Sequence, residues 1–234
     1  MFLNIVFHRI VNKHSDLRDT YELTTSQFVQ TLSLVRRLSR QNVSPFTNYR
    51  LYFDDGDNSF LSIVLPLLKK RELKNVVLAI TTDNVGQPGF LSYDDLSWVQ
   101  EKGVVISSHS VSHPALAYYI NGVAQESAIG AEYQTAPFGH TRRLTAQEIL
   151  FQLKESKKTL QDNGFFTDEF VLPHGCYNDT VLRINKKNNL YDTISTCDEF
   201  IDSGTYLRPR VLTRHDVPLE YFERKITLLT PYTV

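Results

Sequence analysis

The segment Leu51–Asp57 reads Leu51-Tyr52-Phe53-Asp54-Asp55-Gly56-Asp57, so three apolar residues typical of strands run directly into two adjacent carboxylates and a glycine. Neighbouring acids repel each other. A pair of them at the end of an apolar strand therefore indicates that a cation or a shared proton holds them together. The alternative is a simple turn or helix start, where Asp-Asp-Gly is also common.

A second segment of this kind is Val104–Pro114, with the sequence VVISSHSVSHP. Its β-branched run ends in polar residues, and His109 and His113 follow with three residues between them. In a helical turn, positions i and i+4 share a face, so both imidazoles could reach a single ion. Such a pair alone is often incidental. Combined with one aspartate from the first segment, it predicts a metal site with positions open for water and substrate.

Strand-like and helical runs alternate along most of the chain, which predicts an α/β fold with a parallel sheet and helical crossovers. Seven or eight strands are expected, and each candidate residue falls just after one of them. Because the carboxyl ends of barrel strands carry the site, residues distant in sequence can converge there. The expected strands are Leu3–Phe7, Leu51–Phe53, Val76–Ile80, Val104–Ser107, Phe170–Leu172, Leu190–Thr196 and Leu207–Leu212. The expected helices lie near 28–38, 58–68, 93–102, 146–163, 177–188 and 217–229.

Residues 117–144 interrupt this alternation with aromatic and polar side chains that show no clear period. We interpret them as a long loop or lid beside the site, because aromatic residues on a long connection suit sugar stacking. A surface insertion without a role is the alternative.

The composition predicts one globular domain over residues 1–234, with 41% hydrophobic residues and a formal net charge of −1. Neither sign of charge forms a long run, which argues against nucleic acid or an anionic membrane as partner. No segment is apolar enough to span a bilayer, and the amino-terminal apolar run is too short for a signal peptide. Cys176 and Cys197 do not form a disulfide framework. These features predict a cytoplasmic protein.

Tyr52–Gly56 followed by Ser108–His113 resembles the first two motifs of the polysaccharide deacetylases, carbohydrate esterase family 4. The resemblance covers most of the chain and implies the family's distorted barrel of about seven β/α units. It also implies that Asp54 is the catalytic base and that Asp55, His109 and His113 bind one divalent metal ion. We expect Zn²⁺, with Co²⁺, Ni²⁺ or Fe²⁺ as alternatives.

The segment Phe170–Gly175 is similar to the family's third motif, which forms one wall of the site and offers a backbone N–H to the oxyanion. This assigns Pro173, His174 and Gly175 to that wall. The chain departs from the motif twice: Val171 stands where many members have an arginine that orients the base, and His174 stands where they have an aromatic residue. His174 could instead be a surface residue.

Two further segments resemble sequences of the family's exopolysaccharide branch, whose members deacetylate poly-N-acetylglucosamine. The first is Phe7–Ile10 near the start of the chain, which implies that His8 and Arg9 lie in the pocket. The second is the Pro-Arg pair near the end of the chain, which implies that Arg210 lies there too. The segment Thr213–Asp216 is close to the final motif, whose histidine is the general acid, although His215 is offset by about one residue. The alternative for His215 is a solvent-facing loop.

The predicted reaction is metal-dependent hydrolysis of the N-acetyl group of an acetamido sugar or polysaccharide precursor. Asp54 would take a proton from a metal-activated water, His215 would protonate the leaving amine, and acetate would be released. A cytoplasmic location would favour a nucleotide-linked or lipid-linked sugar as the N-acetylated partner. Two alternatives remain: a catalytically inactive glycan-binding barrel, and an amidase that acts on a non-sugar C–N bond.

Overall fold

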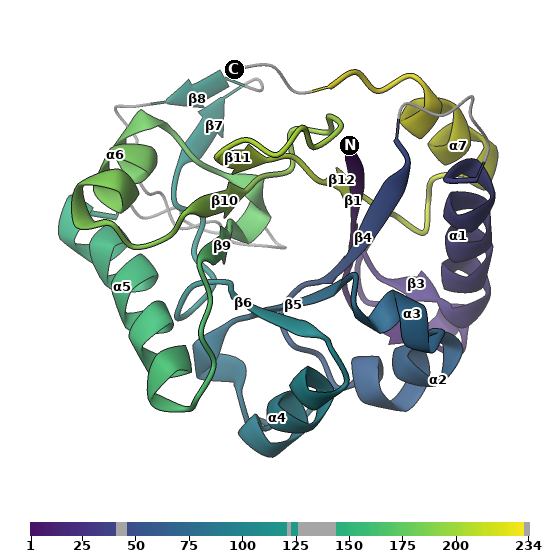
Figure 1. Ribbon diagram of the computed structural model, residues 1–234, viewed down its shortest axis with the longest axis horizontal. Coiled ribbons are helices and arrows are strands. Elements are labelled where there is room, and N and C mark those ends of the chain that lie inside the picture. The colour runs from purple at the N-terminus through teal and green to yellow at the C-terminus, as the bar shows by residue number, and fades with distance from the viewer. Residues whose placement is uncertain (41–45, 121–122, 126–143, 232–234) are drawn as a thin grey trace.

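The computed structural model describes residues 1–40, 46–120, 123–125 and 144–231. Its centre is one curled sheet of eight parallel strands in the order β11-β10-β9-β6-β5-β4-β1-β12 (Figure 1). The strands are β1 (Phe2–Phe7), β4 (Asn48–Phe53), β5 (Val76–Ile80), β6 (Val105–Ser108), β9 (Glu169–Val171), β10 (Thr193–Ser195), β11 (Leu207–Arg208) and β12 (Val211–Leu212). The sheet closes far enough to form the predicted distorted (β/α) barrel.

Helices surround the sheet on its outer side, as Figure 1 shows for α1, α4, α5, α6 and α7. Their bounds are α1 (Thr25–Leu38), α2 (Leu65–Leu67), α3 (Lys70–Leu73), α4 (Tyr93–Glu101), α5 (Ala146–Asp162), α6 (Asp179–Asn188) and α7 (Leu219–Thr227). Within the described ranges, no helix has the length and apolar character needed to cross a bilayer.

Local sequence explains where these helices begin and which face they bury. The Thr24 hydroxyl accepts a hydrogen bond from the backbone N–H of Gln27, and the Gln27 side-chain oxygen accepts one from the backbone N–H of Thr24. These two bonds form a capping box at the start of α1. The apolar stripe of α1 packs into the main core together with β1, β4 and β5. Capping boxes also form at Ser92, the N-cap residue of α4, and at Thr145, the N-cap residue of α5.

The helix expected from residues 58–68 is broken into shorter turns. A π-helical turn covers Phe60–Val64, α2 follows directly, and the chain becomes extended at Leu68 before α3 begins. Pro66 lies in the first turn of α2 and has no N–H to donate to the π-helical turn that precedes it, so the helical hydrogen-bond ladder is interrupted there. The apolar periodicity correctly predicted a helical segment but not this interruption.

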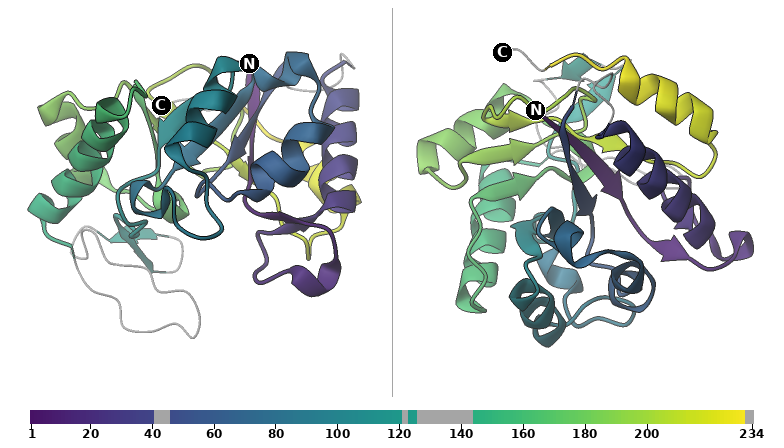
Figure 2. Two further views of the ribbon diagram at one scale, coloured as in Figure 1. Left: turned by 90° about the horizontal axis from the view of Figure 1, so that it is seen from below. Right: turned by 45° about the vertical axis from the view of Figure 1, so that its right-hand side comes forward.

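Residues 117–144 are not a loop throughout. Tyr118–Ile120 (β7) and Val123–Gln125 (β8) pair as an antiparallel hairpin, while residues 121–122 and 126–143 lie outside the described part of the chain. The short strands β2 (Ile10–Val11) and β3 (Leu23–Thr24) form another small sheet. Figure 2 (left) shows both small sheets at one end of the barrel, with the amino terminus at the other.

The prediction of one last strand over Leu207–Leu212 is wrong. The chain forms β11 at one edge of the sheet and β12 at the opposite edge, where β12 pairs with β1. Pro209 and Arg210 cross the gap between these edges. Proline has no N–H to give to a continuing ladder, so a strand ends naturally at this position. The crossing places Arg210 inside the barrel with its side chain fully buried.

Candidate active site

The two aspartates directly follow β4. Asp54 is 4% exposed, and its backbone N–H donates to the carbonyl of Phe7 on β1. Asp55 has a positive φ of 74° and Gly56 has a φ of 81°. Despite this left-handed turn, both carboxylates approach His109 Nε2, with Asp54 Oδ2 at 3.9 Å and Asp55 Oδ1 at 3.6 Å. The sequence prediction that both carboxylates lie at a strand end is therefore correct in position.

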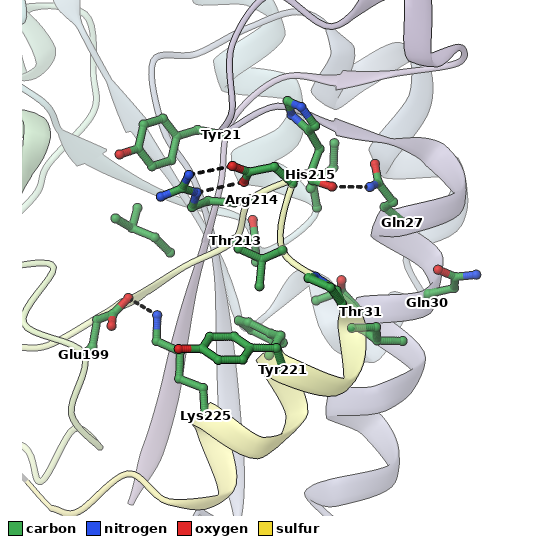
Figure 3. Close-up of a pocket in the computed structure, with 17 residues that line it drawn as sticks. Tyr21, Gln27, Gln30, Thr31, Glu199, Thr213, Arg214, His215, Tyr221 and Lys225 are labelled. Carbon is green, nitrogen blue, oxygen red and sulfur yellow. Dashed lines mark hydrogen bonds and ion pairs between the residues drawn. The ribbon is translucent and has the colours of Figure 1, made fainter.

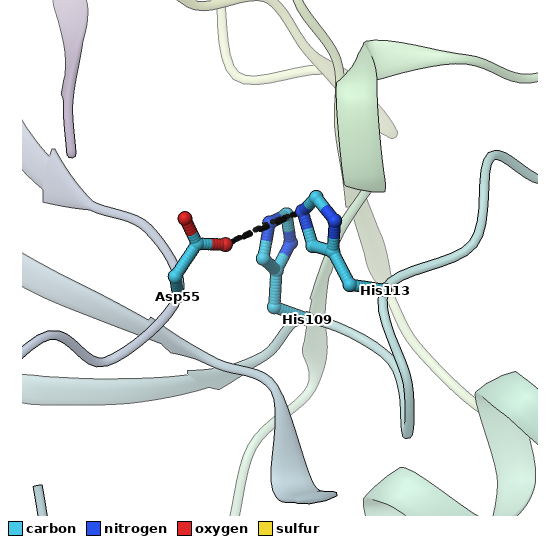
Figure 4. Close-up of side chains that lie close together, drawn as sticks. All are labelled: Asp55, His109 and His113. Atoms are coloured by element: carbon cyan, nitrogen blue, oxygen red, sulfur yellow. Dashed lines mark hydrogen bonds and ion pairs between the residues drawn. The ribbon is translucent and has the colours of Figure 1, made fainter. Parts of the chain in front are cut away.

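Asp55, His109 and His113 converge on one point, as Figure 4 shows. The Nε2 atoms of the two histidines are 3.1 Å apart, and Asp55 Oδ1 lies 3.6 Å from that of His109 and 3.3 Å from that of His113. One ligand atom from each of the three lies within 4.8 Å of the others. Two imidazole nitrogens and a carboxylate oxygen directed at one another need a proton or a cation between them.

The histidines reach this arrangement from a loop, so the helical turn suggested by their i, i+4 spacing is not formed. Ser110 and His113 both have positive φ values, 71° and 60°. The hydroxyl of Ser110 accepts the backbone N–H of His113 at 2.9 Å, which closes the turn. The ring centroids end 4.7 Å apart.

His109 is held in the tautomer that suits a metal ligand. Its Nδ1 lies 2.8 Å from the carbonyl oxygen of Val171, and a carbonyl can only accept, so Nδ1 carries the proton. The Nε2 lone pair is then free to face Asp55 and His113. Burial lowers the pKa of His109 to about 4, so the ring is neutral at pH 7. This is how proteins orient ligating histidines through a second hydrogen bond.

The Asp55 carboxylate is kept ionised by its surroundings. Burial alone would raise the pKa of this carboxyl, but the neighbouring histidines, His113 and His8 foremost, lower it below its ordinary value. An ionised carboxylate at Asp55 and a neutral imidazole at His109 are protonation states that a divalent ion requires. The donor set, its convergence and its ionisation fit such an ion.

Arg210 holds Asp54. Its Nη1 donates to both carboxylate oxygens at 2.9 and 3.0 Å, and its Nε donates to the carbonyl of Thr196 at 3.1 Å. Burial by itself would lower the pKa of the guanidinium, but the charge of Asp54 raises it above the ordinary value. Val171 stands where many family members have an arginine that orients the base. In this protein Arg210, between β11 and β12, contacts Asp54 instead.

His174 lies against the metal-ligand set. It has a φ of 56°, and its ring is 4.5 Å from that of His113 in an edge-to-face arrangement. Burial, together with the charges of His113 and His109, lowers its pKa to about 3. The N–H of Gly175 donates to the carbonyl of Leu172, so that N–H is engaged within the turn. Pro173 is buried in the same turn.

His8 and Arg9 follow β1 at the same end of the barrel and differ in their surroundings. The His8 ring lies 5.6 Å from the Tyr21 ring, and its Nδ1 is buried without a hydrogen-bond partner among the described residues. Arg9 forms an ion pair with Glu22 at 3.1 Å and donates to the carbonyl of Asp16. Arg9 therefore secures the 14–22 segment, while His8 faces the site.

His215 lies beside a separate pocket. Its backbone carbonyl accepts from Gln27 Nε2 at 2.9 Å, and its ring is 5.7 Å from the His14 ring. It lines a cavity of about 550 Å³ between α1, β12 and α7 (Figure 3). None of Asp54, Asp55, His109 or His113 lines that cavity.

Backbone strain gathers at this end of the barrel. Six described non-glycine residues have positive φ, and four of them, Asp55, Ser110, His113 and His174, surround the metal-ligand set. Such conformations cost about 1–3 kcal/mol each and persist only where the surrounding structure holds them in place. Sequence reasoning did not find this strain, nor the carbonyls of Val171 and Thr196 that orient His109 and Arg210. Every residue has a backbone carbonyl, so the sequence does not indicate which carbonyls will accept these hydrogen bonds.

Comparison with solved structures shows the same fold at low sequence identity. A deacetylase from Streptococcus pyogenes, PplD, solved in complex with acetate, is 19% identical with a TM-score of 0.69, covering 96% of this chain and 97% of that one. A de-N-acetylase from Aggregatibacter actinomycetemcomitans is 16% identical with a TM-score of 0.72, covering 96% and 99%. IcaB from Ammonifex degensii is 17% identical with a TM-score of 0.67, covering 97% of both chains.

A search of curated proteins finds no match to this sequence. Residues 45–192, which are more than half of the chain, match the family described as polysaccharide deacetylase. This range includes Asp54, Asp55, His109, His113 and the turn at His174. The chain therefore belongs to the polysaccharide deacetylase family.

Proposed function

We propose that this protein hydrolyses the N-acetyl group of an acetamido sugar with the help of one divalent metal ion, releasing acetate and a free amino sugar. The carrying observation is the convergence of Asp55, His109 and His113 beside a buried carboxylate, Asp54, that an arginine holds. Family membership supports hydrolysis of this class.

Asp55, His109 and His113 would hold the metal, with Zn²⁺ the best match to a ligand set of two imidazoles and one carboxylate. When bound, such an ion polarises the amide carbonyl and lowers the pKa of water. His109 supports binding through its Nδ1 bond to Val171, which keeps Nε2 directed at the site.

Asp54 would act as the general base. Its Oδ2 is 3.9 Å from His109 Nε2, so the carboxylate borders the metal-ligand set. Arg210 keeps the carboxylate in place through an ion pair of 2.9 Å. Asp54 would take a proton from the attacking water as the new C–O bond forms at the acetyl carbonyl carbon.

The leaving nitrogen needs a proton before the C–N bond breaks, and two histidines are candidates for the acid. His215 occupies the position that its sequence motif suggests. His8 is favoured by its position, since its charge acts on Asp55, whereas His215 lines a pocket that contains none of Asp54, Asp55, His109 and His113. The Nδ1 atoms of both histidines lack a partner among the described residues, so this feature does not separate them. We propose His8 as the proton donor, with His215 as the alternative.

The test is acetate release from N-acetylglucosamine and its oligomers by the metal-free protein, before and after addition of Zn²⁺, with a non-sugar acetamide in the same panel. We expect release from the saccharides only, and only with metal. Turnover of the acetamide alone would favour the amidase alternative. No turnover despite bound metal would favour the inactive glycan-binding barrel.

A further inference from the structure

A second pocket lies beside the catalytic end of the barrel, and the proposed reaction makes no use of it. It is the cavity of about 550 Å³ between α1, β12 and α7 (Figure 3). Its walls carry two exposed aromatic rings, Tyr221 at 63% and Tyr21 at 38%, together with polar side chains such as Gln30 and Thr31. Exposed aromatic faces next to hydroxyls and amides suit a ligand that has both apolar faces and hydroxyl edges.

The charges of this pocket cancel in pairs. Arg214 donates to Asp216 through two nitrogens, at 2.9 and 2.6 Å, and Lys225 pairs with Glu199. Apart from histidine, the lining therefore holds two cations and two carboxylates, which sum to zero. A nucleotide diphosphate would have to displace carboxylates from both cations. A neutral ligand would leave both ion pairs intact.

The pocket is close to the proposed active site. Val6 on β1 is in register with Tyr52 on β4 and with Leu212 on β12, so residues two positions further along each strand, His8, Asp54 and Arg214, are at similar heights around the barrel mouth. Adjacent strands are about 4.8 Å apart, so β12 is about 10 Å from β4. That distance exceeds the length of one sugar unit, so a single saccharide chain could place one unit at Asp54 and a unit about two positions further along in the pocket.

Tyr21 connects the two places. Its ring is 5.6 Å from the ring of His8 on one side and 5.9 Å from the guanidinium of Arg214 on the other. Figure 3 shows Tyr21, Arg214 and His215 at one end of the pocket and Tyr221 farther along it. A chain with one sugar at Asp54 and His8 would pass Tyr21 to enter the pocket.

We infer that the pocket between α1, β12 and α7 is a second saccharide subsite, which binds neutral N-acetylhexosamine units about two positions along the chain from the one that is deacetylated, so that a dimer does not reach it. This inference rests on the proposed function and sharpens it, because it makes the substrate an oligosaccharide or polysaccharide rather than a nucleotide-linked monosaccharide. Stacking on Tyr221 would supply much of the subsite's affinity.

The experiment compares acetate release from the dimer and the pentamer of β-1,4-linked N-acetylglucosamine. We expect the wild-type kcat/KM to be higher for the pentamer, and Tyr221→Ala to lose about 5- to 10-fold on the pentamer with no change on the dimer. Tyr221→Phe, which keeps the ring, should behave as wild type. Phe166→Ala removes another exposed aromatic ring, 78% exposed, and should have no effect.

An unchanged pentamer-to-dimer ratio in Tyr221→Ala would overturn the subsite while leaving the deacetylase function standing. If no substrate releases acetate, pentamer binding to wild type and to Tyr221→Ala, measured by isothermal titration calorimetry, still decides the question. Weaker binding by Tyr221→Ala supports the subsite, and equal or absent binding overturns it. Competition by UDP-N-acetylglucosamine that Lys225→Gln abolishes would assign the pocket to nucleotides and also overturn it.

Discussion

Glu72 and Asp55 both have carboxyl pKa values below the ordinary value, but different neighbours lower them. Glu72 is 1% exposed and accepts hydrogen bonds from Arg36, from Tyr49 and from the N–H of Lys69. Burial would raise the pKa of Glu72, but the hydrogen bond from Arg36 lowers it. This cluster carries its own permanent cation, so it needs nothing from solution.

Asp55 faces histidines instead of an arginine. One of them, His109, is neutral at pH 7, and its Nε2 lone pair points at the same place as the carboxylate. The cluster therefore has acceptors in excess of donors. We therefore expect Glu72 to stabilise the fold, whereas Asp55 and its histidines form the site that we propose binds a cation.

The largest expected effect is on turnover. Asp54→Asn should lower kcat/KM for N-acetylglucosamine oligomers by roughly 10³-fold, because a general base contributes about 10²–10⁴-fold. Asp94→Asn, an exposed acid on α4, is the matched control and should keep full activity. Circular dichroism must show that Asp54→Asn folds, since it also removes the charge that pairs with Arg210. A folded variant with wild-type kcat/KM would contradict the role of Asp54.

The next effect is on stability. Glu72→Gln should reduce the free energy of unfolding by about 3 kcal/mol in urea titrations, because it leaves the charge of Arg36 without its partner. Activity per folded molecule and metal content should not change. Loss of metal in Glu72→Gln with unchanged stability would reverse the distinction between the two carboxylates.

Substitution of His8 and of His215 tests which histidine protonates the leaving amine. His8→Gln should lower kcat for the N-acetylglucosamine dimer by roughly 10²-fold, whereas His215→Gln should lower it by less than about 3-fold. The rates should be measured at saturating metal, so that altered metal affinity does not mimic a lost acid. The reverse ranking would return the acid role to His215.

Metal should bind the Asp55 cluster alone. At a free Zn²⁺ concentration about 30 times its Kd, the wild-type free energy of unfolding should rise by about 2 kcal/mol. Asp55→Ala and His113→Ala should lose both this increment and the bound metal in elemental analysis. Retention of about one ion per chain in both variants would place the metal elsewhere.

The smallest effect is on pH dependence. The pKa of Glu72 is lowered in the folded protein from 4.5, so its contribution to stability is complete above about pH 4.5 and is lost as the pH falls through the folded value. The stability difference between wild type and Glu72→Gln should therefore shrink on acidification below about pH 4.5. A difference that grows there, measured by urea titration at several pH values, would contradict this sign.

The strand ends could be predicted from sequence because buried parallel strands are apolar runs that stop at polar residues. That pattern placed Asp54, Asp55 and His109 at one end of the barrel. The path from His109 to His113 could not be predicted, because Ser110 and His113 adopt positive φ without being glycine. Spacing alone favoured a helical turn.

The resemblance of the Pro-Arg pair placed Arg210 in the pocket, but its pairing with Asp54 could not be predicted from the sequence. Arg210 is 156 residues away, and the segment around it looked like one continuous strand. Pro209 was the available signal that the strand stops there. Even so, the jump from one edge of the sheet to the other depends on how far the barrel curls, which no local pattern encodes.

That jump also sets the order in which the protein can become active during synthesis. β12 pairs with β1 across more than 200 residues of chain, and the same crossing delivers Arg210 to Asp54. Contacts this distant in sequence form late, since the intervening chain must be made and folded first. Asp55, His109 and His113 all come from the first half of the chain, whereas Arg210 comes much later in the sequence, so we expect Asp54 to gain its partner last. We therefore expect the closure of the barrel and the pairing of Arg210 with Asp54, the proposed base, to occur together.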